Sequence, residues 1–222
     1  MCDPDVFEDL AGIGIKVSLG DDEGQEVNIG FNFTFFDAVH ETTTISSNGY
    51  ITFGMDASAY IVEDLVSADV PNNFIAPLFV DLHPGRGGTI NYRSLLETDG
   101  MHTFIAQWTN VPDLTQSDDC DDCISNTFQV VLYEADGCFE FRYRQCTALD
   151  IATIGFENAN GTDGFKFENV TEDSCIKVCP PIPSSPPSMM PSDSPSSVPS
   201  MSPSSTCDVC VETFYQCYQA CK

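Results

Sequence analysis

The feature that most constrains the fold is an alternation of large apolar residues in the stretch Asn126–Arg144. Every second residue is large and apolar on both sides of Glu134–Gly137, which is typical of two β-strands that each bury one face. Glu134–Gly137 is typical of a tight turn, because glycine readily adopts a positive φ. The stretch therefore predicts a β-hairpin in which Tyr133 lies opposite Cys138.

The register of this hairpin follows by counting outward from the turn. It predicts three apolar pairs on one face: Leu132 with Phe139, Val130 with Phe141, and Phe128 with Tyr143. The other face carries the polar side chains Gln129, Glu140, Arg142 and Arg144. A slip by one residue would place apolar side chains opposite charged ones, so the pattern itself specifies the register.

Further apolar or alternating stretches predict more short strands. They are residues 27–35, a hairpin over 42–53 that turns at Asn48–Gly49, and residues 74–82, 89–93, 103–108, 151–156 and 164–167. Residues 56–69 are irregular, with room for a short helix. Many short strands with regular turns and little helical periodicity predict an all-β fold, an antiparallel β-sandwich or flattened barrel.

Two of these strands carry exceptions to the simple pattern. Pro77 implies an edge strand or a bulge, because proline cannot donate a hydrogen bond to a neighbouring strand. The hairpin at Asn48–Gly49 mixes apolar and polar residues on each face. Either both of its faces are covered, or its loop is longer than two residues.

Composition divides the chain into three parts. Residues 1–179 form the predicted β domain. Residues 180–206 are almost entirely Pro, Ser and Met, cannot bury enough surface to offset chain entropy, and are predicted to form a disordered, O-glycosylated linker. Residues 207–222 form a small cysteine-rich tail. Its Cys207, Cys210, Cys217 and Cys221 have a plausible metal spacing, but two disulfides are favoured over zinc in a secreted chain.

The charge balance excludes several classes of partner. The chain has 8 Lys+Arg against 34 Asp+Glu, a formal net charge of -26. Nucleic acids and anionic membrane surfaces are bound by clustered Lys and Arg, so neither is expected as a partner. No apolar run reaches the roughly 18 residues of a spanning helix, so no membrane insertion is expected. Divalent cations or cationic partners fit such a chain better.

Cysteines and glycosylation sequons indicate secretion. Eleven cysteines are typical of an oxidising compartment, and the odd number leaves one thiol free, paired between chains or without its partner here. Sequons at Asn32, Asn160 and Asn169 agree with an extracellular, cell-surface or cell-wall location. Residues Met1–Pro4 lack the basic start and apolar core of a signal peptide, so we expect that the signal has been removed or missed.

The hairpin register also predicts disulfide partners. It places Cys146 opposite Ser125, with Cys123 as its diagonal neighbour, which favours a Cys123–Cys146 bridge. A Cys120–Cys146 bridge is the next alternative. Cys120–Cys138 would complete a pair if the insert around Cys120 folds back.

The remaining cysteines of the β domain suggest a second link. A redox role for Cys120-x-x-Cys123 is disfavoured, because the aspartates around it would raise the thiol pKa. Cys2 is predicted to pair with Cys175 or Cys179. Closing so long a loop would contribute roughly 4–5 kcal/mol of stability in the chain-entropy model, less any strain.

The sequence offers no catalytic constellation. His40, His83 and His102 lie in separate loops or strand starts without metal-ligand spacing, which argues against zinc. The chain has no Gly-x-Ser-x-Gly motif, and its turn already explains Ser47. No catalytic residues are therefore predicted, and the chain is not expected to be an enzyme.

Calcium is the one cofactor that the sequence suggests. Loop carboxylates and amides supply the oxygens that calcium prefers. The candidate ligands are Asp21, Asp22, Glu23, Asn158, Asn160 and Asp163, and further carboxylates lie at Asp113 and at residues 118–122. None of them matches an EF-hand loop, and solvated acidic loops are the favoured alternative.

One strand face is a candidate for sugar or protein binding. Trp108 and the outward side chains Gln129, Arg142 and Arg144 could form such a face. Trp108, however, alternates in phase with Phe104, which favours a core position for it.

Four phrases of the sequence resemble the nidogen-type extracellular (NIDO) domain and its microbial relatives. They are residues 27–36, residues 45–54, residues 75–81 followed by 87–93, and residues 108–111 followed by 126–132. The similarity covers roughly residues 19–167. The family has a Trp where this chain has Leu78–Val80, and the insert 119–123 also departs from the family. The Pro/Ser-rich stretch resembles the stalks of algal cell-wall and surface glycoproteins by composition.

The resemblance implies an extracellular β-rich module associated with cell–matrix adhesion, with no catalytic residues to carry over. We therefore expect an adhesion or matrix-type binding module whose partner is an extracellular matrix protein, a cell-wall protein or a glycan. The alternatives are an accessory, carbohydrate-binding domain of a secreted hydrolase and a structural cell-wall glycoprotein.

Overall fold

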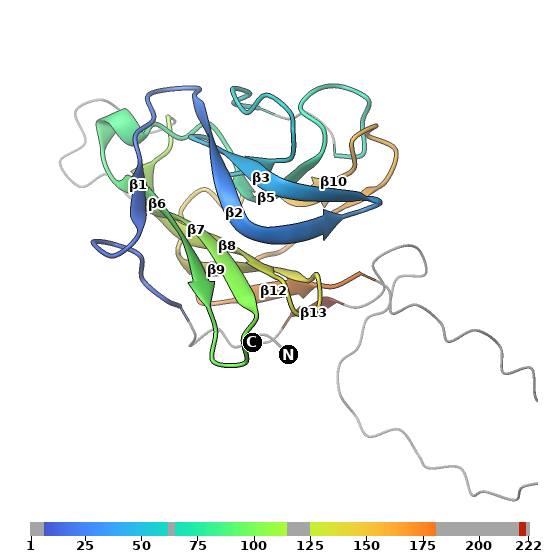
Figure 1. Ribbon diagram of the computed structural model, residues 1–222. Coiled ribbons are helices and arrows are strands. Elements are labelled where there is room, and N and C mark those ends of the chain that lie inside the picture. Colours follow the sequence, from blue (N-terminus) through green and yellow to red (C-terminus); the bar gives the residue numbers. More distant parts are fainter. Residues whose placement is uncertain (1–6, 62–64, 115–124, 181–217, 221–222) are drawn as a thin grey trace, which may run out of the picture.

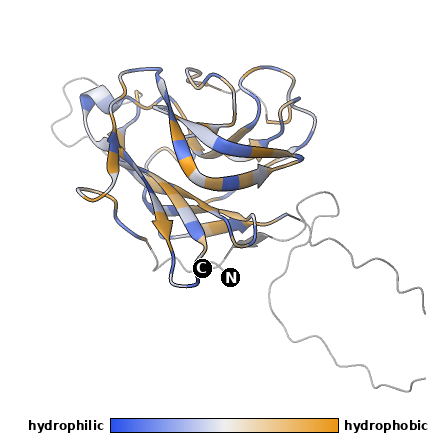
Figure 2. Ribbon diagram, viewed as in Figure 1, coloured by the Kyte–Doolittle hydropathy of each residue, from blue (hydrophilic) through white to orange (hydrophobic). Residues whose placement is uncertain are grey.

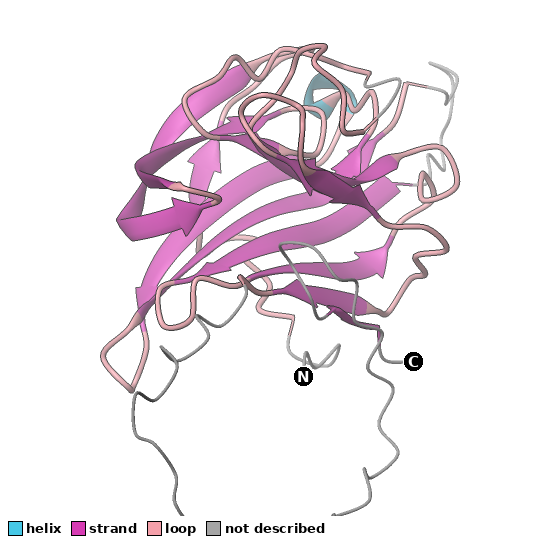
Figure 3. Ribbon diagram, turned by 90° about the vertical axis from the view of Figure 1, so that its right-hand side faces the viewer, coloured by secondary structure: helices cyan, strands magenta, loops and turns pink. Residues whose placement is uncertain are grey.

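The computed structural model describes residues 7–61, 65–114, 125–180 and 218–220 of the chain. They form two antiparallel β-sheets that pack face to face as a sandwich (Figure 1). The predicted all-β sandwich is confirmed, and neither sheet closes into a barrel. Strands account for nearly all of the regular secondary structure (Figure 3). Among the described residues, no helix is long and apolar enough to cross a bilayer.

The first sheet has seven strands. In spatial order they are β1 (Ile15–Val17), β6 (Thr89–Leu96), β7 (His102–Pro112), β8 (Ser125–Tyr133), β9 (Phe139–Gln145), β12 (Cys175–Val178) and β13 (Tyr218–Ala220). The second sheet has six strands. They are β11 (Gly164–Lys166), β10 (Thr153–Glu157), β5 (Phe74–Phe79), β4 (Ile51–Thr52), β3 (Ala38–Ser46) and β2 (Gly24–Phe35). A short 3-10 helix, η1 (Pro84–Arg86), lies between β5 and β6.

The hairpin of β8 and β9 has the predicted register. Leu132 pairs with Phe139, Val130 with Phe141, and Phe128 with Tyr143. Gly137 has a φ of 66°, as the turn requires. Beyond these three pairs the register shifts by one residue between Thr127 and Phe128, so that Thr127 lies opposite Gln145. This irregularity moves every residue beyond it relative to the partner strand.

Strand β2 shows how alternation builds the interface between the sheets. Its odd-numbered residues from Val27 to Phe35 are buried, and the even-numbered residues between them are exposed. The hydropathy colouring alternates along this strand accordingly (Figure 2). The Phe33 ring stacks on Phe53, and the Phe35 ring packs against Phe53 at a tilt. Phe35 also contacts Phe139 of the other sheet in an edge-to-face arrangement. The aromatic side chains of the inner faces therefore form one continuous core.

The hairpin around Asn48–Gly49 has a loop longer than two residues. Ile45 pairs with Ile51, and the Ser46 amide donates to the Tyr50 carbonyl, so residues 47–49 form the loop. Gly49 has a φ of 78°, and a Cβ at this position would lie 2.0 Å from the Leu78 carbonyl oxygen. Only glycine fits this close approach between the hairpin and β5.

Strand β5 lies inside its sheet, between β10 and β4, so the edge position that Pro77 allowed is wrong. The alternative, a bulge, is correct, because the pairing with β10 shifts between Thr153 and Gly155. In the described part of residues 56–69 the structure has bends but no helix. The short strands β1 and β12 were not expected from the sequence, because three or four residues carry too little alternation to signal a strand.

Candidate functional site

The outer face of the seven-stranded sheet is partly covered by the chain's own residues 8–10. Gln107 and Gln129 lie opposite each other on β7 and β8, and both are fully buried. The Gln107 Oε1 atom accepts a hydrogen bond from the Leu10 amide at 2.8 Å, and Gln129 Nε2 donates to the Glu8 carbonyl. The Leu10 side chain is buried in a small apolar cluster with Ile105 and Val131. Two glutamines and one leucine thus fix this N-terminal segment on the sheet.

The chain itself therefore covers much of the strand face that was a candidate for sugar or protein binding. Gln129 is buried beneath the N-terminal segment, and Arg142 is only 9% exposed. Arg144 remains about half exposed, but it pairs with Asp9 at 3.4 Å. Trp108 lies in the core, as the strand alternation favoured, and is fully buried. Sequence alternation identified the outward direction of these side chains, but it could not show that a distant segment covers them.

Beside this segment lies a groove of about 490 Å³, here called the outer-face groove. Its lining includes Glu8, Met101, His102, Tyr133 and Arg142. The walls come from the N-terminal segment and from the β6–β7 and β8–β9 turns, while β7, β8 and β9 provide the floor. Its size falls in the range of roughly 300–1,000 Å³ that is usual for ligand sites.

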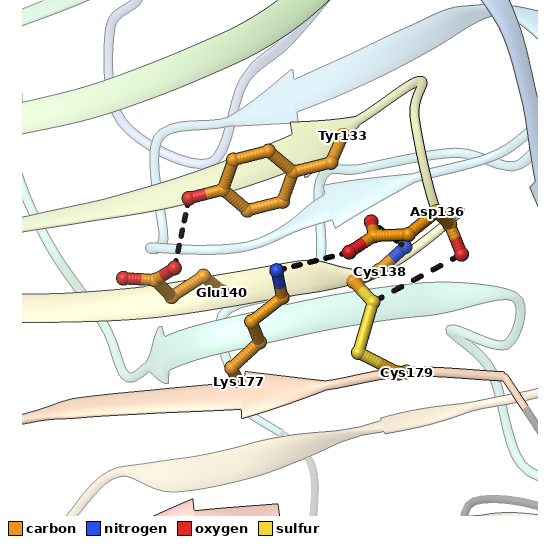
Figure 4. Close-up of a disulfide and its surroundings, with 6 residues drawn as sticks. All are labelled: Tyr133, Asp136, Cys138, Glu140, Lys177 and Cys179. Atoms are coloured by element: carbon orange, nitrogen blue, oxygen red, sulfur yellow. Dashed lines mark hydrogen bonds and ion pairs between the residues drawn. A yellow bond between two sulfur atoms is a disulfide. The ribbon is translucent and has the colours of Figure 1, made fainter. Parts of the chain in front are cut away.

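The floor of the outer-face groove holds a polar network. Tyr133 Oη donates to Glu140 at 2.8 Å (Figure 4). Arg142 Nε donates to the other oxygen of Glu140 at 2.8 Å, and Arg142 Nη2 donates to Tyr133 Oη at 2.8 Å. Burial raises the pKa of Tyr133. Burial opposes the charge of Arg142, but Tyr133 and Glu140 outweigh it and raise the pKa of Arg142. The network keeps a guanidinium, a carboxylate and a hydroxyl in fixed positions.

The rim of this groove is mostly acidic. Glu97, Asp99 and Glu8 contribute carboxylates, and Glu8 pairs with Arg93 at 3.1 Å. His102 Nδ1 lies 2.8 Å from Glu134, and this hydrogen bond lowers the pKa of Glu134. Such a groove can hold a polar ligand through several hydrogen bonds.

A second candidate is a cluster of three carboxylates, here called the acidic cluster. Asp21, Asp22 and Asp81 each place a carboxylate oxygen within 4.8 Å of the others. Asn48 Nδ2 donates to Asp22 at 2.8 Å, and Asn48 Oδ1 accepts from the Leu82 amide at 2.9 Å. Asn48 therefore joins the turn that carries Asp21 and Asp22, here called the acidic turn, to the residues at the end of β5. This connection explains why residues far apart in sequence meet here.

Asp81 is the carboxylate of the acidic cluster in the least favourable environment. Among the described residues its Oδ1 atom is buried and has no hydrogen-bond partner. Burial raises the pKa of Asp81, and the negative charges of Asp22 and Asp21 raise it further. A cation between these carboxylates would remove both the repulsion and the unsatisfied oxygen.

The structure brings only some of the predicted calcium ligands together. It brings Asp81, which the sequence did not suggest, next to Asp21 and Asp22. The Glu23 carboxylate instead accepts a hydrogen bond from the Gly20 amide at 2.6 Å. Asn158 Oδ1 accepts from the amides of Asn160 and Thr162, as in an Asx-turn. Asp163 belongs to the turn that contains Asn158 and is half-buried. Asp113 is buried, and residues 118–122 lie outside the described residues.

The described disulfide differs from the predicted pairs. Cys138 bonds to Cys179 with an S–S distance of 2.03 Å (Figure 4). Because β12 pairs with β9, it places Cys179 at the end of one strand beside Cys138 at the start of the other. The Cys120–Cys138 prediction is therefore wrong, and so is the alternative in which Cys2 pairs with Cys179. Without β12 in the predicted topology, the true partner of Cys138 could not be identified.

Cys146 is a free, buried thiol in the described part of the chain. The predicted Cys123–Cys146 bridge and its Cys120–Cys146 alternative are therefore wrong. The physical reason is the register shift at Thr127, which changes the neighbours of Cys146 and leaves its Sγ 3.5 Å from the Thr127 carbonyl. Burial raises the pKa of Cys146 to about 12, so the thiol is a poor nucleophile.

The other cysteines add one firm observation. Cys175 is disulfide-bonded. The pairing of Cys2 with Cys175 stays a prediction, because Cys2 lies outside the described residues, as do Cys120, Cys123 and the four cysteines of the tail. Most of the predicted linker and tail lies outside them as well. Residues Tyr218–Ala220 of the tail form β13, which pairs with β12.

The three histidines lie on separate elements. His40 is on β3, His83 precedes η1, and His102 is on β7. In the described residues no histidine joins a group of three metal-ligating side chains.

The three sequons all have accessible positions. Asn32, Asn160 and Asn169 are exposed, and the threonine of each sequon is exposed as well. Asn32 lies on the outer side of β2, Asn160 lies between β10 and β11, and Asn169 follows β11. All three therefore belong to the six-stranded sheet or its connections.

Comparison with known proteins identifies the class to which this sandwich belongs. A family model of NIDO-related domains matches residues 5–178, which span the two packed sheets up to β12. The chain therefore belongs to the NIDO-related family, as its resemblance to that family indicated.

Particular relatives come from two mammals. The chain is 27% identical to alpha-tectorin of Homo sapiens over 140 residues, covering 55% of this chain and 6% of that protein. The alpha-tectorin of Mus musculus gives the same identity and coverage. The chain thus corresponds to a small part of these relatives. No solved structure gives a significant match.

Proposed function

We propose that this chain is an extracellular, matrix-type binding module without catalytic activity. The observation that carries the proposal is the NIDO-related match over residues 5–178, which takes in most of the described sandwich. Similarity to alpha-tectorin supports an extracellular location. The Cys138–Cys179 bridge and the disulfide-bonded Cys175 support an oxidising compartment.

The outer-face groove is the proposed binding site. The Tyr133 hydroxyl and the Arg142 guanidinium line it from two neighbouring strands, β8 and β9, and the buried Glu140 carboxylate holds both of them in place, so a polar ligand meets preorganised hydrogen-bonding groups. The proposed partner is an extracellular matrix protein, a cell-wall protein or a glycan. Because the rim is acidic, cationic groups of a protein partner would bind it favourably.

Binding of the secreted chain to immobilised matrix proteins and to a glycan array tests this proposal. Met101→Trp fills the groove and is expected to reduce binding at least about tenfold, which corresponds to 1.4 kcal/mol. Leu96→Trp is the matched control, because Leu96 is exposed but does not line the groove. Equal binding by both variants would place the site elsewhere on the molecule.

The same experiment separates the alternatives. Binding to glycans alone would favour an accessory carbohydrate-binding domain of a secreted hydrolase. No specific binding to either class would favour a structural cell-wall glycoprotein. Residues 180–206 are proposed as the O-glycosylated linker, and residues 207–222 as a tail closed by two disulfides.

N-glycosylation at Asn32, Asn160 and Asn169 is part of the proposed function. The exposure of each asparagine and of its threonine supports it, because the modification requires an accessible sequon. Glycans at these positions would cover the six-stranded side of the sandwich.

Calcium binding by the acidic cluster is a second proposal. It is supported by the buried Oδ1 of Asp81, which has no hydrogen-bond partner among the described residues, and by the proximity of Asp21 and Asp22. Calcium prefers carboxylate oxygens, and Asn48 Nδ2 donates to Asp22 and so orients one of these carboxylates. Bound calcium would fasten the acidic turn to the end of β5 and so stabilise one end of the sandwich.

A further inference from the structure

The hollow beside Asn169 has features that the binding function does not explain. It measures about 560 Å³ and is lined by Leu149–Ile154, Lys166–Val170 and Ile61. It lies where β10 begins and β11 ends, at one edge of the six-stranded sheet. This position is distinct from the outer-face groove and from the acidic cluster.

Two large apolar side chains at this hollow are exposed to solvent. Ile61 is 61% exposed and Ile151 is 57% exposed. Covering them would remove apolar surface from water. Polar groups lie beside them, including Lys166 and Glu168, whose charged ends are 3.7 Å apart. The hollow therefore combines an apolar surface with hydrogen-bonding groups.

Asn169 itself lines this hollow. It is exposed, and so is Thr171, which completes its sequon. Asn169 has a φ of 58°, a left-handed conformation that asparagine adopts more readily than most residues. Of the three sequon asparagines, all of which the structure describes, Asn169 alone is part of this lining.

We propose that the hollow is the seat of the glycan attached to Asn169, which packs its first N-acetylglucosamine residue against Ile151 and Ile61. An N-acetylglucosamine ring has one apolar face and an acetyl methyl group, which match the two isoleucines. Its hydroxyl and amide groups match Lys166 and Glu168. The attachment atom belongs to a lining residue, so the sugar is delivered to the hollow at high effective concentration. This inference rests on the proposed N-glycosylation.

The consequence is that the three glycans differ in role. The glycan on Asn169 acts as a structural part of the sandwich and covers the start of β10. Asn32 lies on an extended strand and Asn160 in a turn, and their glycans project into solvent.

The test uses the full chain secreted from a glycosylating host. Thr171→Ala removes the Asn169 glycan, and Thr171→Ser retains the sequon as the matched control. Thr171→Ala is expected to lower the melting temperature by about 2–4 °C, an ordinary shift for a chain of this size. It should also speed amide exchange in residues 149–154. Thr171→Ser should behave as the parent chain. Asn160→Gln and Asn32→Gln, which remove glycans elsewhere, should change neither measurement.

A glycosidase that trims each glycan to its first sugar provides a second test. The trimmed protein should keep most of the protection of residues 149–154, because the first sugar makes the contact. Glycopeptide mass spectrometry measures the occupancy of each sequon independently. Occupied Asn169 without any stabilising effect would overturn the proposed seat but not the glycosylation. Absence of a glycan at Asn169 would overturn both.

Discussion

Trp108 Nε1 donates a hydrogen bond to the main-chain oxygen of Ser46, 3.0 Å away, across the interface between the two sheets. Trp108 belongs to β7 of the seven-stranded sheet, and Ser46 ends β3 of the six-stranded sheet. The Trp108 ring also stacks on Phe128 with a centroid distance of 5.0 Å. One side chain therefore fills the core and fixes the sheets relative to each other at the Asn48–Gly49 hairpin.

Trp108→Phe is expected to lower the free energy of unfolding by about 1–3 kcal/mol, because it leaves a small cavity and removes the hydrogen bond to Ser46. Urea denaturation of the full chain measures the change. Tyr92→Phe, on the neighbouring strand, is the control and should have a smaller effect. Equal effects would mean that the contact between Trp108 and Ser46 contributes no specific stability.

Gln107→Ala is expected to release the N-terminal segment from the sheet. The substitution leaves the buried amide of Leu10 without its acceptor, a loss of about 1–3 kcal/mol for a buried polar group. Hydrogen exchange at Leu10 and limited proteolysis within residues 7–14 should both become faster. Gln25→Ala, at an exposed position of β2, should leave both rates unchanged. Unchanged exchange at Leu10 in Gln107→Ala would show that Gln129 and the Leu10 side chain hold the segment without Gln107.

Replacing both Cys138 and Cys179 by serine is expected to destabilise the fold by about 4 kcal/mol. The bridge closes a sequence separation of 41 residues, and the chain-entropy model gives this magnitude for a loop of that length. Thermal unfolding without reductant measures the loss. Cys146→Ala serves as the control, since Cys146 is free, and it should cost only what a buried thiol contributes to packing. A non-reducing peptide map that showed Cys146 in a disulfide would contradict the described arrangement.

Asp81→Asn is expected to raise the melting temperature in the presence of chelator near pH ~7. Burial and the neighbouring carboxylates raise the pKa of Asp81 in the folded state, so its charge destabilises the fold above its ordinary pKa of 3.8. This penalty disappears as the pH falls and Asp81 becomes protonated in both states. The gain from Asp81→Asn should therefore vanish near pH ~3.

Calcium should reverse the effect of this substitution. If calcium binds the acidic cluster, millimolar calcium raises the melting temperature of the parent chain by mass action, and Asp81→Asn loses most of this response. Asp163→Asn tests the other predicted calcium group and should keep the response. A parent melting temperature that is the same in calcium and in chelator would remove the calcium proposal.

The strands were predictable because their signal is local. The alternation of apolar and polar residues places Val27–Phe35 and the β8–β9 hairpin correctly, and it places Trp108 in the core. A buried face requires that alternation wherever a strand lies, so no knowledge of its neighbours is needed. The shortest strands, β1 and β12, carry too few residues for such a signal.

The binding surfaces were less predictable, because they depend on segments distant in sequence. The direction of Gln129 followed from the hairpin, but its burial depends on Glu8, 121 residues away. Asp21 and Asp22 were identified as candidate ligands, but Asp81 joins them only because Asn48 connects the acidic turn to the end of β5.

The sequence by itself determined the all-β character, the register of the central hairpin from its turn to the Phe128–Tyr143 pair, and the inward side of strands such as β2, because period-two alternation admits one arrangement of buried faces. Tertiary structure alone decided that Cys138 bonds to Cys179, that Cys146 stays free and that the N-terminal segment covers Gln107 and Gln129. These contacts depend on the order of strands in the sheet and on a one-residue register shift at Thr127. A single extra residue in one strand changes the cross-strand partner of every residue beyond it. The sequence of the displaced residues does not show that this shift occurs.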